Sequence, residues 1–192
     1  MSYDGELIER KTTAISSFPS SNLKTARELI HPKCLELLQY RNHEEEKSAR
    51  LYEDMYMFLS NNGYTNAGNL WHKYAHEELT HADWARSYLL SLGIQPELRP
   101  MPLLKGDYEG LVDIIKKSYL HEIEITRQCN ELAEAADEAG DHMLQDLAHK
   151  YLREQIEEVD KMQTWMDKLK AFGEDKMAMR FLEMEIGEML ED

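Results

Sequence analysis

Apolar residues recur at intervals of three and four along four long segments of the chain, which is the spacing of one face of an α-helix. The first stripe runs from Pro32 to about residue 60, and the second from about residue 65 to about residue 92. The third and fourth cover about residues 108–138 and 141–171, and a shorter apolar pattern follows Gly173. The pattern therefore predicts an all-α protein with four long helices and a short fifth helix.

Residues typical of helix ends mark the boundaries of these segments. Pro32 suits the first turn of a helix, and Thr65 or Asn66 is expected to cap the second helix. Gly93 is expected to end the second helix, and Asp107 to cap the third. These positions leave only short turns between the first and second helices and between the third and fourth.

The segment between the second and third helices is longer and contains prolines at positions 96, 100 and 102. It cannot be helical through its middle, and its length allows it to cross a bundle from end to end. Residues 1–28 lack a sustained apolar stripe, and "SSFPSSN" would break a helix there. We expect residues 1–28 to be a flexible or loosely docked extension of one domain, residues 29–192.

Charge and cysteine content narrow the classes of function. The 37 acidic and 22 basic residues give a formal net charge of −15, which argues against nucleic-acid and anionic-membrane surfaces and suits a protein that handles cations. No apolar run approaches the ~20 residues of a membrane span, and the N-terminus lacks a signal-peptide core. Cys34 and Cys129 form no CxxC motif. The cytoplasm is therefore the expected location.

Polar residues interrupt each apolar stripe near the middle of its helix. They are Glu45, Glu78 with His81, Glu122, and Gln155 with Glu158. Glu45 precedes Glu78 by 33 residues and His81 by 36. Glu122 precedes Gln155 and Glu158 by the same two intervals. Antiparallel packing of two such helix pairs would bring all of these side chains to one level.

Buried carboxylates without partners cost several kcal/mol each, so this register indicates bound cations. Carboxylates with one imidazole suit iron or manganese, and a bridging carboxylate can hold two ions roughly 3.5–4 Å apart. Taken singly, Glu78 could be a surface residue, His81 an ordinary core histidine and Tyr52 a packing residue. Their shared register favours a two-metal site.

The residues around this register resemble those of the ferritin-like di-iron carboxylate family, in particular the non-haem ferritins of bacterial type. The resemblance runs from about Leu29 to the C-terminus, and four motifs carry it: "HEEEKSARLY" (43–52), "AHEELTH" (75–81), "HEIEITRQCNELAEAA" (121–136) and "YLREQIEEVDKM" (151–162). It implies a ferritin-like four-helix bundle with a long crossover between the second and third helices and a short fifth helix.

The resemblance also implies roles for individual residues. Glu45, Glu78 and His81 would bind a first iron, and Glu78 would share a second iron with Glu122 and Glu158. Gln155 would lie beside these ligands, and Tyr52 would donate a hydrogen bond.

A third, more exposed iron site is implied at Glu77, Glu154 and Glu157, together with Glu158. On spacing alone, these three additional residues could equally form a solvated acidic face. Lys150 stands where such ferritins often have a tryptophan, which puts electron-transfer details in doubt. Leu79 stands where haem-binding relatives have methionine, so no haem is expected.

The activity implied is oxidation of Fe(II) by O2 or H2O2, followed by mineralisation of the ferric product inside a hollow shell of 24 identical subunits. The fifth helix would line the four-fold axis, and Asp137, Glu138 and Asp141 would line entry channels for iron. Two other classes stay open. A soluble di-iron oxidase or peroxidase would form a small oligomer, and an acidic helical interaction protein would need no metal.

Overall fold

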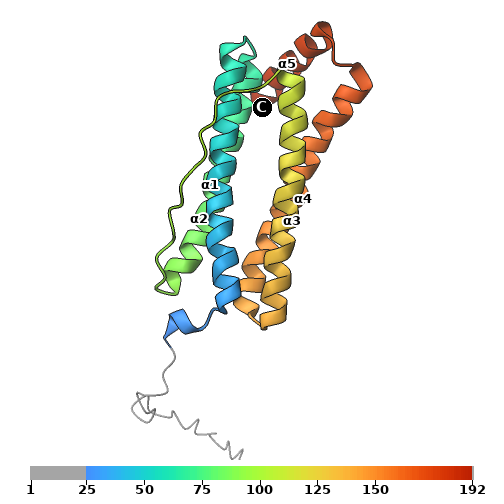
Figure 1. The fold of residues 1–192 in the computed structure, drawn as a ribbon. Helices are drawn as coiled ribbons and strands as arrows, with labels where there is room; N and C mark the ends of the chain where they lie inside the picture. Colours follow the sequence, from blue (N-terminus) through green and yellow to red (C-terminus); the bar gives the residue numbers. More distant parts are fainter. Residues whose placement is uncertain (1–24, 192) are drawn as a thin grey trace, which may run out of the picture.

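The computed structural model describes residues 25–191 as a four-helix bundle with an appended helix (Figure 1). A short 3-10 helix precedes the bundle, and the elements are η3 (Ala26–Glu28), α1 (Pro32–Asn61), α2 (Thr65–Ser91), α3 (Leu111–Ala139), α4 (His142–Phe172) and α5 (Lys176–Glu191). Helix α1 packs mainly on α2, α3 packs on α4, and α5 packs against α2. The predicted all-α class, the four long helices and the short fifth helix are confirmed.

The connection between α2 and α3 follows the length of the bundle beside α1 (Figure 1). Near its start, Gln39 donates to the carbonyl of Gln95 over 3.1 Å and accepts from the backbone amide of Glu97. Near its end, Asp54 accepts bonds from the Gly106 amide and the Tyr108 hydroxyl, at 3.1 and 2.8 Å. The span of α1 from Gln39 to Asp54 is about 22 Å at the helical rise, so the predicted crossover is confirmed.

Two of the predicted helix caps are wrong. The third helix begins after Gly110 rather than Asp107, because contacts of the adjacent Gly106 and Tyr108 with Asp54 hold this segment in the connection. The second helix begins after Tyr64, and neither Thr65 nor Asn66 is its cap. By contrast, Gly93 does end α2. Its left-handed φ of 68° allows the amides of Gly93 and Ile94 to bond the last turn of the helix.

Glu183 of α5 supplies the missing cap of α2. Its buried carboxylate accepts from the backbone amides of Asn66 and Ala67 at 2.6 and 2.9 Å, and the Asn66 side chain donates back to the Glu183 carbonyl. These amides lie in the first turn of α2, where N–H groups lack helical partners and negative charge is favoured. Gly187 allows the close approach of the two helices, since a Cβ there would lie 2.4 Å from Nδ2 of the Asn66 side chain.

The apolar core is divided into two clusters, one toward each end of the bundle. The first takes residues 52–59 of α1, 67–75 of α2, 111–115 of α3 and 162–169 of α4, together with the apolar face of α5. The second takes residues 34–38, 85–94, 125–136 and 144–151, together with Ile30. The level between the clusters is left to polar side chains, and it coincides with the register identified in the sequence.

Most of the predicted N-terminal extension lies outside the described residues. Of its last four residues, Arg27 donates to the Gly93 carbonyl over 3.0 Å. The division into an extension and a domain beginning at residue 29 therefore stays a prediction. Among the described helices, none is long and apolar enough to cross a membrane.

Replacing Glu183 by alanine should loosen α5 and lower the stability of the protein by roughly 1–2 kcal/mol, because two first-turn amides of α2 lose their acceptor. Denaturant unfolding would measure the loss, and amide exchange at Asn66 and Ala67 should become faster. Glu188→Ala, at an exposed position on the same helix, is the matched control. Equal stability of the two variants would contradict this account of how α5 is attached.

Candidate metal centre

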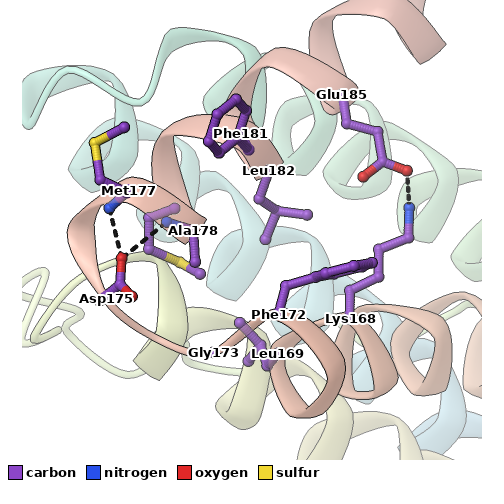
Figure 2. A pocket seen from close by; sticks show the side chains of 11 residues that line it. Lys168, Leu169, Phe172, Gly173, Asp175, Met177, Ala178, Phe181, Leu182 and Glu185 are labelled. Carbon is purple, nitrogen blue, oxygen red and sulfur yellow. Dashed lines mark hydrogen bonds and ion pairs between the residues drawn. The ribbon is translucent and has the colours of Figure 1, made fainter.

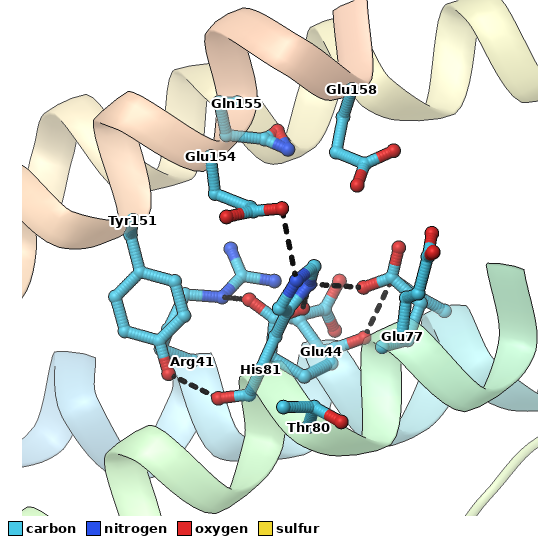
Figure 3. Close-up of polar contacts among 12 residues, drawn as sticks. Arg41, Glu44, Glu77, Thr80, His81, Tyr151, Glu154, Gln155 and Glu158 are labelled. Carbon is cyan, nitrogen blue, oxygen red and sulfur yellow. Dashed lines mark hydrogen bonds and ion pairs between the residues drawn. The ribbon is translucent and has the colours of Figure 1, made fainter. Parts of the chain in front are cut away.

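The four long helices bring the predicted polar residues together in one buried layer. Its members are Glu45 of α1, Glu78 and His81 of α2, Glu122 of α3, and Gln155 and Glu158 of α4, and none of them is more than 7% exposed. Figure 3 shows Glu154, Gln155 and Glu158 of α4 facing His81 of α2. Because the helices are held in register by the apolar clusters on both sides, the layer is a fixed feature of the fold.

Glu45, Glu78 and His81 form the first group able to hold a metal ion, since one ligand atom from each lies within 4.8 Å of the others. The Nδ1 atom of His81 is 3.3 Å from Glu78 Oε2 and 4.0 Å from Glu45 Oε2. Glu45 Oε2 is buried and has no hydrogen-bond partner among the described residues. A buried carboxylate oxygen without a donor suits a cation, so these residues fit a metal ion.

Glu122 is held by two neutral donors. The Tyr52 hydroxyl donates to Glu122 Oε1, and the Gln155 side-chain amide donates to Glu122 Oε2 over 3.0 Å. Tyr52 and Gln155 thus lie beside the carboxylate layer as the resemblance implies. Their bonds fix the orientation of the Glu122 carboxylate.

A second group joins His81 to α4 through its other ring nitrogen. The Nε2 atom of His81 lies 3.6 Å from Glu154 Oε1, and Glu154 and Glu158 complete a group within 4.8 Å. Glu77 instead forms an ion pair with Lys161 at 3.4 Å, and Glu157 is exposed and belongs to neither group. Of the three residues expected at a third site, the structure therefore brings only Glu154 into a candidate group.

Burial and mutual repulsion raise the pKa values of three carboxylates in this layer. Burial, followed by the nearby Glu45 and Glu122, raises the pKa of Glu78 well above its ordinary value. Burial also raises the pKa of Glu122 to about 8, against the opposing hydrogen bond from Tyr52 and with a contribution from Glu158. The pKa of Glu158 is likewise raised by burial, although Lys161 partly offsets the effect. Without metal, burial therefore favours the protonated forms of Glu78, Glu122 and Glu158.

Sequence reasoning missed two cations next to the layer. Arg41 is buried and its Nε atom lies 2.8 Å from Glu45 Oε1, and Lys161 lies 3.0 Å from Glu158 Oε1. Both follow the helical spacing, with Arg41 one turn before Glu45 and Lys161 one turn after Glu158. In the sequence, a basic residue three or four positions from a predicted buried glutamate was the signal that could have identified both cations. Even with these cations, four buried carboxylates face only two permanent positive charges among the described residues of the layer.

Lys150 contacts a tryptophan from another helix. The Lys150 ammonium lies 3.7 Å from the centre of the Trp84 ring. The Trp84 ring lies 4.8 Å from the His81 ring and 5.3 Å from the Tyr151 ring. An indole therefore does lie beside the centre, contributed by α2 rather than α4.

The acidic residues at the junction of α3 and α4 have structural partners. Asp141 caps α4 by accepting from the Leu144 amide over 3.0 Å, and Glu138 pairs with Lys33 at 3.1 Å. Asp137 accepts from the Gln145 side chain. Their part in a channel for iron stays a prediction.

The bundle and its buried layer define a helical protein with a candidate metal site of carboxylates and one histidine. The family described as a ferritin-like domain matches residues 35–172, which is more than half of the chain. The chain belongs to this ferritin family, so the family predicted from the four motifs is confirmed.

Individual relatives agree with this assignment. The chain is 28% identical over 158 residues to a bacterial non-heme ferritin of Escherichia coli O6:H1, covering 82% of this chain and 96% of that protein. It is 26% identical over 159 residues to a bacterial non-heme ferritin of Staphylococcus aureus, covering 83% and 96%. An open pore ferritin of the archaeon Archaeoglobus fulgidus has a similar structure, with a TM-score of 0.78 and 27% identity over 82% of this chain and 96% of that chain.

The metal-free protein should become more stable when Glu122 is replaced by glutamine, and the gain should grow with pH. The fold raises the pKa of Glu122 from 4.5 to about 8, so the folded protein keeps a proton that the unfolded chain releases between these values. Stability is therefore lost as the pH rises through this window, whereas glutamine cannot ionise. Denaturant unfolding at about pH 5 and about pH 8 would measure the difference.

Glu134→Gln, at an exposed position of the same helix, is the control and should change stability equally little at both pH values. If Glu122→Gln does not increase the free energy of unfolding at the higher pH, ionisation of Glu122 does not destabilise the metal-free fold.

Proposed function

We propose that this protein is an iron-storage ferritin whose buried layer oxidises Fe(II) to Fe(III) for mineralisation inside a hollow shell. The observation that carries the proposal is the meeting of four buried carboxylates and one imidazole at mid-bundle. Carboxylate and imidazole ligands suit iron, and the layer lacks enough positive charge of its own. Membership of the ferritin family and similarity to proteins named bacterial non-heme ferritins support the same activity.

In the proposed reaction, two Fe(II) ions are substrates and each gives up one electron. With O2 as oxidant, the two electrons and two protons form H2O2, and with H2O2 they form two water molecules. Glu45, Glu78 and His81 would bind one ion, and Glu78 would also bind the other. Glu122 and Glu158 would complete the second set of ligands. The shared Glu78 would hold the pair at the short spacing that two-metal sites use.

Tyr52 and Gln155 would position Glu122 through the hydrogen bonds described above. Lys161 would hold Glu158 and Glu77 until a cation displaces its ammonium group. Glu154, which already lies near His81 and Glu158, would be the first member of a third site, with Glu77 and Glu157 joining it once iron is bound. The protein thus supplies spacing, charge compensation and access, while the iron supplies the redox chemistry.

Self-assembly is the part of the proposal supported by α5. Phe172 is 71% exposed and Phe181 is 64% exposed, and both line a groove of about 470 Å³ between the end of α4 and α5 (Figure 2). Large apolar side chains gathered in this way are typical of an interface. We propose that copies of this chain cover the groove in a shell of 24 subunits, with α5 at the four-fold axis.

The location proposed is the cytoplasm. Cys34 and Cys129 are both buried free thiols, as expected of a protein that folds under reducing conditions.

Aerobic loading with several hundred Fe(II) ions per assembly, followed by a sizing column read for protein and iron together, tests storage. A mineralising ferritin should elute as one particle of hundreds of kilodaltons that carries far more than two or three irons per chain. Elution as a small oligomer with no more than that amount would replace storage with a soluble di-iron oxidase or peroxidase.

Replacing Glu78 by glutamine should slow rapid Fe(II) oxidation roughly 100-fold or more, beyond the 10- to 100-fold effect of removing an outer partner of a metal ligand. Stopped-flow absorbance of the ferric product would measure the rate. Glu36→Gln, at an exposed position of α1, should leave it unchanged. A fast Glu78→Gln variant would exclude this layer as the oxidation site and favour an interaction protein that needs no metal.

A further inference from the structure

Two histidines outside the buried layer share one outer face of α2. His72 and His76 are one helical turn apart, and their Nε2 atoms are 3.2 Å from each other. His76 is exposed and the His72 side chain is 41% exposed, whereas Glu78, two residues after His76, faces the core. Neither histidine takes part in the proposed oxidation site, and both side chains are at least partly exposed.

Side chains of α1 hold this pair in place. The Tyr56 ring stacks on the His72 ring, with centroids 4.5 Å apart and an interplanar angle of 19°. Glu53 brings a carboxylate oxygen to 3.6 Å from His72 Nε2. Its side chain is 43% exposed and therefore free to turn. Glu53 thus approaches His72 but not yet His76, because the three side chains do not have ligand atoms within 4.8 Å of one another. It would have to turn toward the two imidazoles to share an ion with them.

The spacing of the two nitrogens matches that of ligands bound to one ion. Two nitrogens held tetrahedrally at about 2.0–2.1 Å from zinc are roughly 3.3 Å apart, close to the 3.2 Å observed. A hydrogen bond between two exposed imidazoles replaces bonds to water and gains little. The stacked and paired arrangement is therefore better suited to holding a cation than to stabilising the fold.

We propose that His72 and His76 form a second type of metal site, which binds one borderline divalent transition-metal ion such as Zn²⁺, with Glu53 turning to reach the ion. Imidazole nitrogens favour Zn²⁺, Ni²⁺ and Cu²⁺ over the hard cations that an all-oxygen site takes. Water completes the coordination, because the site is open on its outer side. The net charge of −15 attracts cations to the protein as a whole.

The site is independent of the proposed oxidation of iron. It uses none of the residues of the buried layer, so either function can fail while the other holds.

Zinc binding to the assembled, metal-free protein tests the proposal. Equilibrium dialysis would count Zn²⁺ per chain, and X-ray absorption would report the ligands. Zinc can also enter the buried carboxylates, so the double variant Glu78→Gln, His81→Ala, which removes a ligand from both buried groups, provides the background in which the outer site is measured. In that background we expect one zinc per chain with two nitrogen neighbours at about 2.0–2.1 Å.

Adding His72→Ala and His76→Ala should abolish this zinc and its nitrogen signal, and adding Glu53→Gln should weaken it at least tenfold. His149→Ala removes an exposed histidine of α4 that also follows an acidic residue by three positions, and it should leave the zinc in place. With the buried layer intact, the His72→Ala, His76→Ala variant should keep normal elution and Fe(II) oxidation. Equal zinc content with and without the two histidines would overturn the proposal and leave only a hydrogen bond between the rings.

Discussion

The burial of four carboxylates at one level of the bundle is the constraint on which the rest of the structure depends. Glu45, Glu78, Glu122 and Glu158 lie between two apolar clusters that exclude water from both sides. A carboxylate in such a place must be protonated, paired with a basic side chain or bound to a cation. Arg41 and Lys161 supply two ion pairs, and the remaining imbalance makes the layer a candidate site for metal. The apolar clusters thus hold the helices together and also create the need for cations.

The topology explains how four helices meet this constraint. The same intervals of 33 and 36 residues separate the polar positions in the α1–α2 pair and in the α3–α4 pair, so the two pairs contribute at the same depth. The connection between the pairs runs along α1 and is fixed to it by Gln39 and Asp54. That connection lets the second pair start from the same end of the bundle as α2, which brings both sets of polar side chains to one level.

Histidine and glutamate side chains have different partners in this structure according to how deeply they are buried. His81 is buried and presents one nitrogen to the first group of carboxylates and the other to Glu154. His72 and His76 are open to solvent and meet each other instead. Glu183 is buried as well, but its charge is satisfied by the amides at the start of α2. The same residue types therefore form a candidate metal centre, a proposed outer cation site and a helix cap within one chain.

Periodicity determined the helices and the depth of the polar register, because an apolar stripe and its interruptions are local features of a helix. It could place Glu45, Glu78, His81, Glu122, Gln155 and Glu158 on inner faces for the same reason. The prolines and the length of the segment between the second and third helices determined the crossover. Only the tertiary structure decided which partners surround the polar residues. The cap on α2 comes from Glu183, more than a hundred residues away, and the tryptophan beside His81 is Trp84, whose ring carries the ammonium group of Lys150 from α4. Contacts between distant helices depend on packing in three dimensions, and no spacing along one helix encodes them.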